Sequence, residues 1–477
     1  MIKIKEKFEN LTIAKPAKAG VFYIITNAFT KLIALLATPL FTRLLLPEEY
    51  GVYSLYISWM GIVSVSVALG ISGGAIYRAL GKFGKDGEGV ISSAIGIIFI
   101  SSAALFIPSL LFRHTVSALT GLSPLLNLML ILEVFLNCAQ AVVFAFHRYK
   151  YSYVRICLIN LLYALISVGV AFAIIYFTRI KAEARIYASF FASATLTLPL
   201  IRRYLKPKIP RGKEMRKYLI KLSLPLLPSA LSTALIAQLD KLMIERLGGT
   251  AALGKYSIAY SVGFMLTTLT AALYSALQPW LMRKLNSGNT DAARAITEKI
   301  IFLTALGLLV FLLLIPEIFK IIAAEAYRDA EIAVYPLAAA GYLQFISNLL
   351  AANIIHTEKT LAISVSGLIA FAFNLVTNLF LIPRFSYPAA AITTAISYLI
   401  LVFLEYFYLK RRSPLKIADK KTLTPLWLIL FALPVYFLRE IFISRFIFAL
   451  AVILSALPTL IKFIRAFLER RGESETN

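Results

Sequence analysis

Long apolar stretches alternate with short polar segments along the chain, and this pattern predicts about fourteen membrane-spanning helices. Most of the stretches reach about 20 residues, the length that an α-helix needs to cross a bilayer. They are continuous rather than alternating in polarity, which argues against a β-barrel. The predicted spans are 17–43, 52–77, 88–112, 125–147, 153–178, 184–205, 219–245, 254–280, 298–316, 331–355, 360–382, 388–409, 424–438 and 443–464.

One stretch of the chain occurs twice. Residues 30–58 align without a gap on residues 233–261, and 11 of these 29 positions are identical, including Arg43 with Arg246 and Tyr53 with Tyr256. A repeat of this length in an apolar chain indicates two homologous helix bundles, a common plan of secondary transporters. The predicted organisation is an N-terminal six-helix lobe (1–205), a basic cytoplasmic linker (206–218), a C-terminal six-helix lobe (219–410) and an extra hairpin (424–464).

Composition supports an integral membrane protein. The chain is 60% hydrophobic and 15% charged, and its mean hydropathy is +0.80. Its net charge of +25 does not indicate a nucleic-acid partner, because the basic residues form short clusters between the apolar spans. With the N-terminus inside, the inner segments hold 35 of the 49 Lys and Arg residues and the outer loops 12. We therefore expect a multi-pass protein of the cell (cytoplasmic) membrane with both termini in the cytoplasm.

Four charged residues stand out inside predicted spans, where charge is costly and needs a reason. Lys31 shares one helix face with Asn27 and Thr38, which predicts a polar stripe that faces a cavity. Asp240 and Lys241 either pair with each other near the outer end of their span or serve transport. Glu133 either pairs with Lys31 or handles an ion; with Asp240, it is our candidate for coupling H⁺ or Na⁺.

Further polar residues are candidates for contact with a substrate. Asn137 and Gln140 follow Glu133 at spacings of four and seven and extend its face of the helix. Arg43 and Arg246, at the outer ends of equivalent helices, are either interface anchors or a paired outer gate. Arg78 lies at the cytoplasmic end of the second span, where it either sets the orientation of the chain in the membrane or binds phosphate. Polar residues such as Gln344, Asn374 and Asn378 either bind sugar hydroxyls or bridge helices.

No motif of an enzyme is present. The phosphate-binding loop of ATPases is absent, so the sequence does not support ATP hydrolysis, and neither a cofactor nor a metal site is expected. The acidic pair Glu48-Glu49 directly precedes a helix, and we interpret it as a helix cap. Cys138 and Cys157 both lie within apolar spans and offer no disulfide framework.

Three segments carry a resemblance to a known family. Residues 39–56 (PLFTRLLLPEEYGVYSLY) resemble the opening signature of polysaccharide (Wzx-type, O-antigen) flippases, and residues 238–260 (QLDKLMIERLGGTAALGKYSIAY) resemble their second-half signature. Residues 389–397 (AAAITTAIS) are similar to the twelfth-helix pattern of the same family. The resemblance implies the multidrug/oligosaccharidyl-lipid/polysaccharide exporter fold, with two six-helix lobes facing each other in a V and two additional C-terminal helices.

The same resemblance implies a function. Members of the family move undecaprenyl-diphosphate-linked oligosaccharides from the inner to the outer leaflet, so the expected partners are such a lipid-linked oligosaccharide, membrane lipids and other polysaccharide-assembly proteins. A cavity near Lys31, with Arg43, Arg78, Lys241 and Arg246 at its mouths, would neutralise the pyrophosphate. The alternatives are a lipid II flippase, a cation-coupled multidrug antiporter of the same superfamily, and a membrane glycosyltransferase or polymerase.

Overall fold

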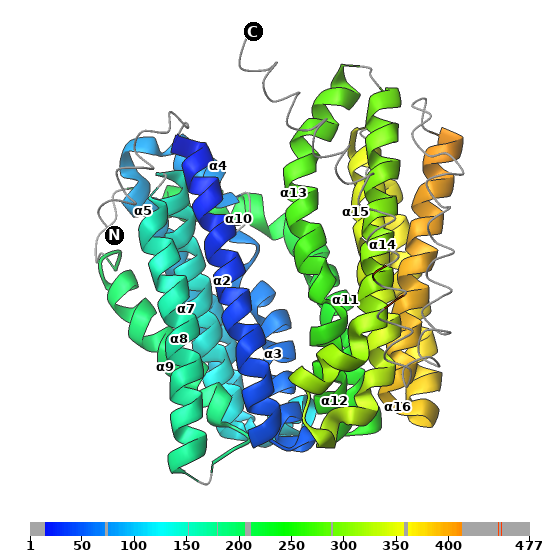
Figure 1. Cartoon of the computed structure of the whole chain (residues 1–477). Coiled ribbons are helices and arrows are strands. Elements are labelled where there is room, and N and C mark those ends of the chain that lie inside the picture. The colour runs from blue at the N-terminus through cyan, green and yellow to red at the C-terminus, as the bar shows by residue number, and fades with distance from the viewer. Residues whose placement is uncertain are drawn as a thin grey trace, which may run out of the picture. The chain divides into compact units, whose positions relative to one another are not determined.

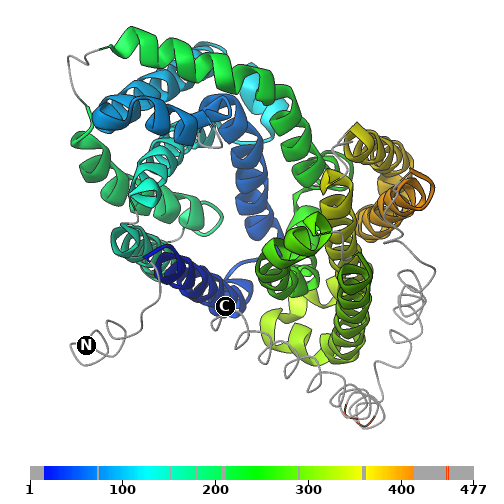
Figure 2. The ribbon, with the colours of Figure 1, turned by 90° about the horizontal axis from the view of Figure 1, so that it is seen from above.

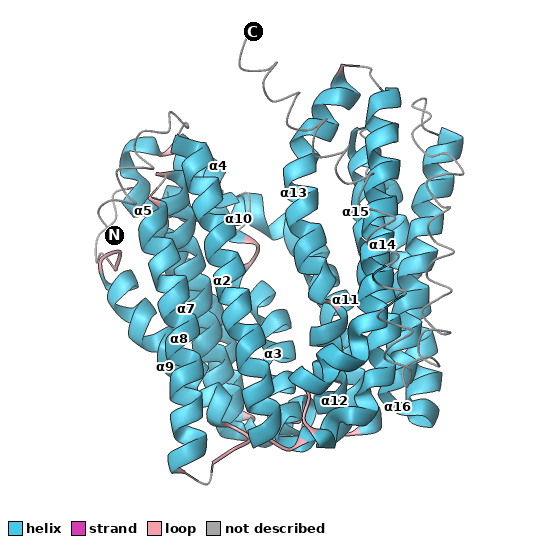
Figure 3. Cartoon of the chain, viewed as in Figure 1, coloured by secondary structure: helices cyan, strands magenta, loops and turns pink. Residues whose placement is uncertain are grey.

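The computed structural model describes residues 15–71, 75–150, 152–178, 180–205, 211–287, 290–356 and 361–412, together with positions 447 and 450. Every regular element in this part of the chain is a helix, and no strand occurs in it (Figure 3). Eight of the described helices are long and apolar enough to cross a membrane. These findings confirm the all-α membrane fold. The expected hairpin at 424–464 lies outside the described residues.

By its packing the chain divides into two compact units, Met1–Leu242 and Met243–Asn477. The division falls within one helix, α11, whereas the lobe boundaries expected from the sequence remain a prediction. In each unit the long helices pack side by side as a bundle (Figures 1 and 2). The elements that begin in the first unit are α2 (Lys15–Leu44), α3 (Pro47–Ala68), α4 (Ile76–Lys82), η2 (Gly84–Asp86), α5 (Gly87–Leu111), α6 (Arg113–Thr120), α7 (Pro124–Tyr149), α8 (Tyr153–Phe177), α9 (Ala184–Arg202), α10 (Gly212–Ser223), η3 (Leu224–Leu226) and α11 (Leu227–Gly248).

Local sequence fixes where the helices of this unit start. Helix α3 opens with Pro47, and the Glu49 carboxylate accepts the Leu46 N–H at 2.7 Å, as the cap interpretation of the acidic pair predicted. Helix α7 likewise opens with a proline, and the Ser123 hydroxyl accepts the Leu126 N–H at 3.4 Å. These caps satisfy donors that the first turn of a helix leaves unpaired.

The second predicted span, 52–77, is interrupted. Helix α3 ends at Ala68 because Leu69 and Gly70 adopt positive φ values of 48° and 72°. Such a left-handed residue is a common way to end a helix. The chain continues through Ile71, and the separate helix α4 begins at Ile76.

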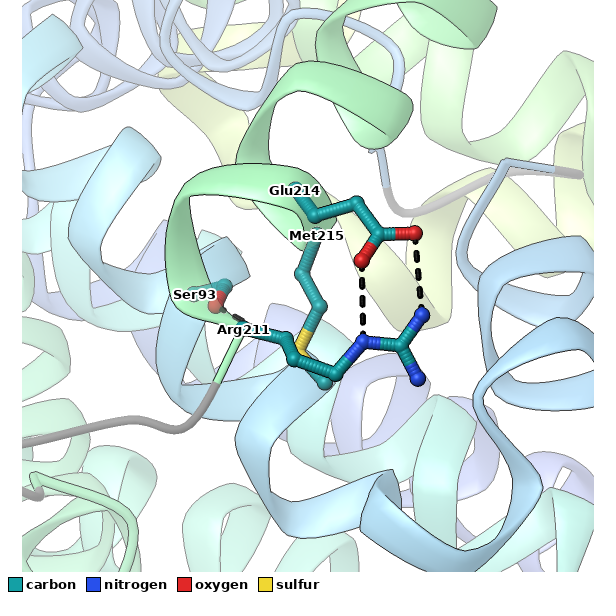
Figure 4. Close-up of polar contacts among 4 residues, drawn as sticks. All are labelled: Ser93, Arg211, Glu214 and Met215. Atoms are coloured by element: carbon teal, nitrogen blue, oxygen red, sulfur yellow. Dashed lines mark hydrogen bonds and ion pairs between the residues drawn. The ribbon is translucent and has the colours of Figure 1, made fainter.

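The basic segment before the seventh span contains a helix of its own. Helix α10 packs against α5 and α4, with Met215 and Leu219 buried, and the predicted span 219–245 is represented by η3 and α11. Figure 4 shows how α10 is held: the Ser93 hydroxyl contacts the Met215 sulfur at 3.9 Å, and Arg211 donates two hydrogen bonds to Glu214 at 2.9 and 3.0 Å. The alternation of apolar and basic residues in α10 places the charges on its exposed face.

The second unit is built around one buried helix. Its elements are α12 (Thr250–Gly263), α13 (Met265–Asn286), α14 (Thr290–Ile322), η4 (Glu325–Ala330), α15 (Glu331–His356) and α16 (Leu361–Arg412). Helix α15 packs against α12, α13, α14 and α16. At Gly263 a Cβ would come within 2.6 Å of the Leu337 Cβ, so the glycine permits a close approach of α12 to α15. The eighth predicted span, 254–280, is divided between two helices: α12 ends at Gly263, and α13 begins at Met265.

The 52 residues of α16 form a hairpin rather than a straight helix. Ser386 is non-helical (φ 56°, ψ −152°) and lies between Pro383 and Pro388. The Thr393 hydroxyl donates to the Asn378 side chain, fifteen residues earlier, which requires the chain to reverse between them. A proline disfavours the helical conformation of the residue before it and clashes with the preceding turn, which explains the break. The reversal confirms the two predicted spans, 360–382 and 388–409.

Candidate functional site

A fully buried carboxyl group lies inside the first unit. Glu133 is 0% exposed and stands on α7, which packs against α3, α5 and α9. The Tyr56 hydroxyl, from α3, donates to the Glu133 Oε2 at 2.7 Å, and the Ser189 hydroxyl, from α9, approaches the same oxygen at 3.3 Å. The other oxygen, Oε1, is buried and has no hydrogen-bond partner among the described residues. The Glu133 Oε1 is therefore available to bind a proton or a small cation.

A second polar layer lies one helical turn further along the same helices. The Ser193 hydroxyl donates to the Asn137 Oδ1 at 2.8 Å, and the Asn137 Nδ2 lies 3.7 Å from the Met60 sulfur. Residues four apart share one face of a helix, so the pairs Glu133–Ser189 and Asn137–Ser193 stack along the contact between α7 and α9. We call these two pairs the α7–α9 polar ladder.

Arg185 precedes Ser189 by four residues and lies among three aromatic rings. Its guanidinium carbon is 3.7 Å from the ring centre of Tyr53, 4.4 Å from that of Phe41 and 5.0 Å from that of Tyr50. Its Nη1 is buried and has no hydrogen-bond partner in the described part of the chain. Cation–π contacts with rings from α2 and α3 thus hold the start of α9 against both helices.

The predicted site residues do not all meet in this ladder. Glu133 and Asn137 belong to it, and Gln140, half-buried, follows on α7. The side chain of Lys31 lies outside the described set, although its backbone is part of α2. The proposed pairing of Lys31 with Glu133 therefore stays a prediction.

The other basic candidates occupy helix ends. Arg43, exposed in the last turn of α2, donates to the Pro39 carbonyl at 2.9 Å. Arg78 is exposed on α4. Arg246 is exposed near the end of α11, 3.9 Å from the Glu245 carboxylate. These placements fit either an anchor or a binding role.

Asp240 and Lys241 lie on α11 and differ in burial. Asp240 is 8% exposed. Lys241 is half-buried, and its Nζ lies 3.5 Å from the Gln238 Oε1. The Gln238 side chain in turn packs over Gly61 of α3, where a Cβ would lie 3.2 Å from it. The Lys241 ammonium thus has a polar neighbour on its own helix.

The second unit has its own interior polar groups. Thr393, Asn378 and Asn374 form a hydrogen-bonded chain within the α16 hairpin. The Gln344 amide donates to the Tyr398 hydroxyl at 3.0 Å, between α15 and α16. Of the two roles left open for these residues, the contacts of Gln344 and Asn378 show the bridging of helices, whereas Asn374 bonds Asn378 within one half of α16. Near the η4 element Lys255 and Asp329 form an ion pair at 2.6 Å.

Sequence reasoning missed Tyr56, Ser189 and Arg185. One signal was available: Arg185, Ser189, Ser193 and Thr197 recur every four residues and so mark one face of α9. Tyr56 carries no such signal, because its role depends on a carboxyl group 77 residues away in the chain.

Comparison with known proteins places this fold. The family model described as polysaccharide biosynthesis protein matches residues 17–285, more than half of the chain. The chain belongs to this family. The match confirms the resemblance to polysaccharide flippases that the signatures in each half indicated.

Three known proteins are also similar to this chain. A probable low-salt glycan biosynthesis flippase, Agl15, of Haloferax volcanii is 22% identical over 404 residues, covering 82% of this chain and 83% of the relative. The lipid II flippase MurJ in an inward closed conformation has a TM-score of 0.67 at 14% identity, over 94% of this chain and 99% of that one. An inward-facing multidrug resistance MATE transporter of the MOP superfamily has a TM-score of 0.65 at 16% identity, over 80% and 94%.

All three are described as flippases or transporters. The family match and the Haloferax volcanii relative confirm the predicted class, a transporter and not an enzyme. The two solved structures confirm the predicted membrane fold. The two solved structures share only the fold with this chain, because their sequence identity to it is low.

Proposed function

We propose that the protein is a flippase that moves an undecaprenyl-diphosphate-linked oligosaccharide from the inner to the outer leaflet by alternating access, for surface polysaccharide synthesis. The observation that carries this proposal is the family match over residues 17–285. The similarity to a glycan biosynthesis flippase along most of both chains supports it. In this proposal both termini are cytoplasmic, and other polysaccharide-assembly proteins are its partners.

The cargo carries negative charge on its pyrophosphate, and basic side chains are the groups that bind it. Lys31 is the proposed central contact, and Arg43, Arg78, Lys241 and Arg246 supply positive charge at the ends of their helices. Gln140 is a proposed contact for sugar hydroxyls. The Asn137 Oδ1 accepts from Ser193, so we assign Asn137 to the α7–α9 polar ladder with Glu133. We also keep it on the predicted substrate face.

Coupling to an ion completes the cycle. Glu133 is the first candidate for binding H⁺ or Na⁺, since its Oε1 is buried without a partner among the described residues, and Asp240 is the second. A buried carboxylate without a cation is unfavourable, so binding of a proton or a cation at Glu133 would be strongly preferred. Release of that ion would then accompany the return of the empty carrier.

Surface glycan in a deletion strain tests the cargo. Complementation with the wild-type gene should restore the glycan, and Lys31→Ala should abolish it at normal protein levels. Lys213→Ala is the matched control, because Lys213 is an exposed basic residue on α10. Full glycan with Lys31→Ala would contradict the proposed role of Lys31. No restoration by the wild-type gene would contradict the proposed cargo and leave the lipid II and drug transporter alternatives to test.

Proteoliposomes test the coupling ion. Flipping of a fluorescent lipid-linked oligosaccharide should respond to a proton gradient or to a sodium gradient, and Glu133→Gln should remove that response. Flipping that ignores both gradients would contradict ion coupling while leaving the choice of cargo intact.

A further inference from the structure

The second unit contains a buried carboxyl group that the proposed function does not use. Glu405 lies on the second half of α16 and is 1% exposed. The Ser347 side chain, from α15, lies beside it. Its Oε2 is buried and has no hydrogen-bond partner within the described chain. Like Glu133 in the first unit, Glu405 therefore has one carboxyl oxygen without a hydrogen-bond partner among the described residues.

Few charged residues lie on the described helices around Glu405. Helix α16 packs against α15 and α12, whose charged or titratable residues are Glu331, His356 and Lys255. Lys255 is engaged by Asp329 at 2.6 Å. The basic residues of α16 itself are Arg384, near the hairpin turn, and Lys410 to Arg412, in the last turn. No cation in the described residues forms an ion pair with Glu405.

Neutral groups fill the rest of this interface. Tyr398 precedes Glu405 by seven residues on the same face of α16, and Gln344 precedes Ser347 by three on α15. The Gln344–Tyr398 hydrogen bond is 3.0 Å long. The contact between α15 and α16 thus holds two polar pairs, of which only one contains an ionisable carboxyl group.

The same plan occurs in the first unit with the roles exchanged. There the glutamate stands on the fourth predicted span and the serine on the sixth, as Glu133 and Ser189. In the second unit the serine stands on the fourth span and the glutamate on the sixth. Each unit also has a neutral pair beside its carboxyl group, Asn137–Ser193 in the first and Gln344–Tyr398 in the second. The two carboxyl groups thus occupy different positions of the repeat.

An ionised carboxylate in such surroundings is strongly disfavoured, because one neutral hydroxyl does not replace its hydration. We propose that Glu405 is a second proton-binding site, in which the carboxyl group, beside Ser347, takes up a proton at Oε2 and gives it up during the transport cycle. The use of this proton in transport rests on the flippase function proposed above. The binding of the proton does not.

The two sites lie toward opposite ends of their helices. Glu133 is nine residues after the start of α7, which is the predicted outer end. Glu405 is seven residues before the end of α16, which is the predicted cytoplasmic end, or about 10 Å along the helix axis. Glu405 is therefore placed to exchange its proton with the cytoplasmic side.

Infrared spectroscopy of the purified full-length protein tests the proposal without any cargo. A protonated carboxylic acid has a carbonyl-stretch band that a carboxylate lacks. At neutral pH the wild-type protein should show this band, and Glu405→Gln should remove one component of it. Ser347→Ala should shift that component in frequency without removing it. Glu325→Gln is the control and should leave the band unchanged, because the Glu325 side chain is 85% exposed.

A spectrum of Glu405→Gln identical to that of the wild type would overturn the proposal, since Glu405 would then be ionised. If Glu405→Gln does not fold, Glu405→Asp keeps a carboxyl group and should keep the component, and its absence there would also count against the site. The amount of surface glycan tests the use of the proton in transport separately from its binding. A strain with Glu405→Gln that makes normal glycan would overturn the role of this proton in transport. Failure of the wild-type protein to move glycan would leave the infrared result standing.

Discussion

Inside the membrane part of this protein, hydroxyl groups and aromatic rings surround three ionisable side chains. Tyr56 and Ser189 hydrogen-bond Glu133, Ser347 lies beside Glu405, and three rings surround Arg185. None of these groups has an oppositely charged ion-pair partner among the described residues. Such sites respond strongly to the loss of a single neutral neighbour, because a buried polar group is then left without one of its partners.

Removing one hydroxyl from the Glu133 site should therefore be measurable. Tyr56→Phe deletes the 2.7 Å hydrogen bond and should lower the free energy of unfolding by about 1–3 kcal/mol. Ser189→Ala should cost less, since its bond to Glu133 is 3.3 Å long and the serine also bonds the Ile186 carbonyl. Thermal unfolding of the purified variants measures both. Equal stability of Tyr56→Phe and the wild type would mean that the hydroxyl does not support the carboxyl group.

The contacts of the Arg185 guanidinium with three aromatic rings give a second prediction on stability. Arg185→Ala should lower the free energy of unfolding by about 1–3 kcal/mol, because cation–π contacts contribute about 0.5–2 kcal/mol each and the three share one cation. Arg185→Lys should retain part of this energy, since an ammonium also binds ring faces. Arg113→Ala, at the exposed start of α6, is the control without an expected change. A loss as large at Arg113 would show that the assay reports general charge effects.

At the scale of the helices, small local features decide where an element begins, ends or approaches its neighbour. Gly263 lets α12 approach α15 closely, Leu69 and Gly70 end α3, and Pro383 and Pro388 enclose the turn of α16. The same unit also contains a glycine with free space around it, which gives a matched test of packing.

Gly263→Ala should destabilise the second unit by about 1–3 kcal/mol, because the new methyl group would meet the Leu337 Cβ at 2.6 Å. Gly307→Ala, on α14, should instead stabilise it by about 0.5–1 kcal/mol, since no atom lies within 4 Å of that Cβ position. Thermal unfolding compares the two substitutions. Stabilisation by both would show that backbone entropy, not contact with α15, controls the effect at Gly263.

Helix α10 offers a test by pH. Its Arg211 hydrogen-bonds Glu214 and holds the pKa of that carboxyl group below its ordinary value. A lowered pKa means that the pair stabilises the helix above the unfolded pKa and that this stabilisation is lost as pH falls through the folded pKa. Amide hydrogen exchange at the start of α10, corrected for the intrinsic effect of pH, should therefore show less protection in acid. In Glu214→Gln the protection should not change with pH over the same range.

At the scale of the whole chain, the sequence predicted the helices better than the site. Apolar runs placed twelve spans that correspond to the helices from α2 to α16, and the prolines around Ser386 fell where the hairpin turns. The contacts of Arg185 could not be predicted in the same way, because its three rings come from residues more than 130 positions earlier. Glu405 lies four residues from the end of its predicted span, where a charge usually reaches the membrane surface, so only the structure shows that it is buried.

The charge of the proposed cargo gives a prediction for the complete transporter. Moving an anion out of a cell with an inside-negative potential is favourable by about 2.3 kcal/mol per charge per 100 mV. Outward flipping in proteoliposomes should therefore become faster when a potassium diffusion potential makes the cytoplasmic side negative. An uncharged lipid-linked analogue is the control for general effects of the potential on the membrane. A rate independent of potential would indicate that the transported complex carries no net charge.

The turn at Ser386 has a consequence for how the protein is made. Because the two halves of α16 are joined through a single non-helical residue and bond to each other through Thr393 and Asn378, almost no polar loop exists to hold the hairpin open during synthesis. The first half, alone in lipid, would leave the Asn378 Oδ1 without the Thr393 hydroxyl that donates to it. We therefore expect the two halves to enter the bilayer together as one hairpin, and a tag inserted at this turn to lower the amount of protein in the membrane.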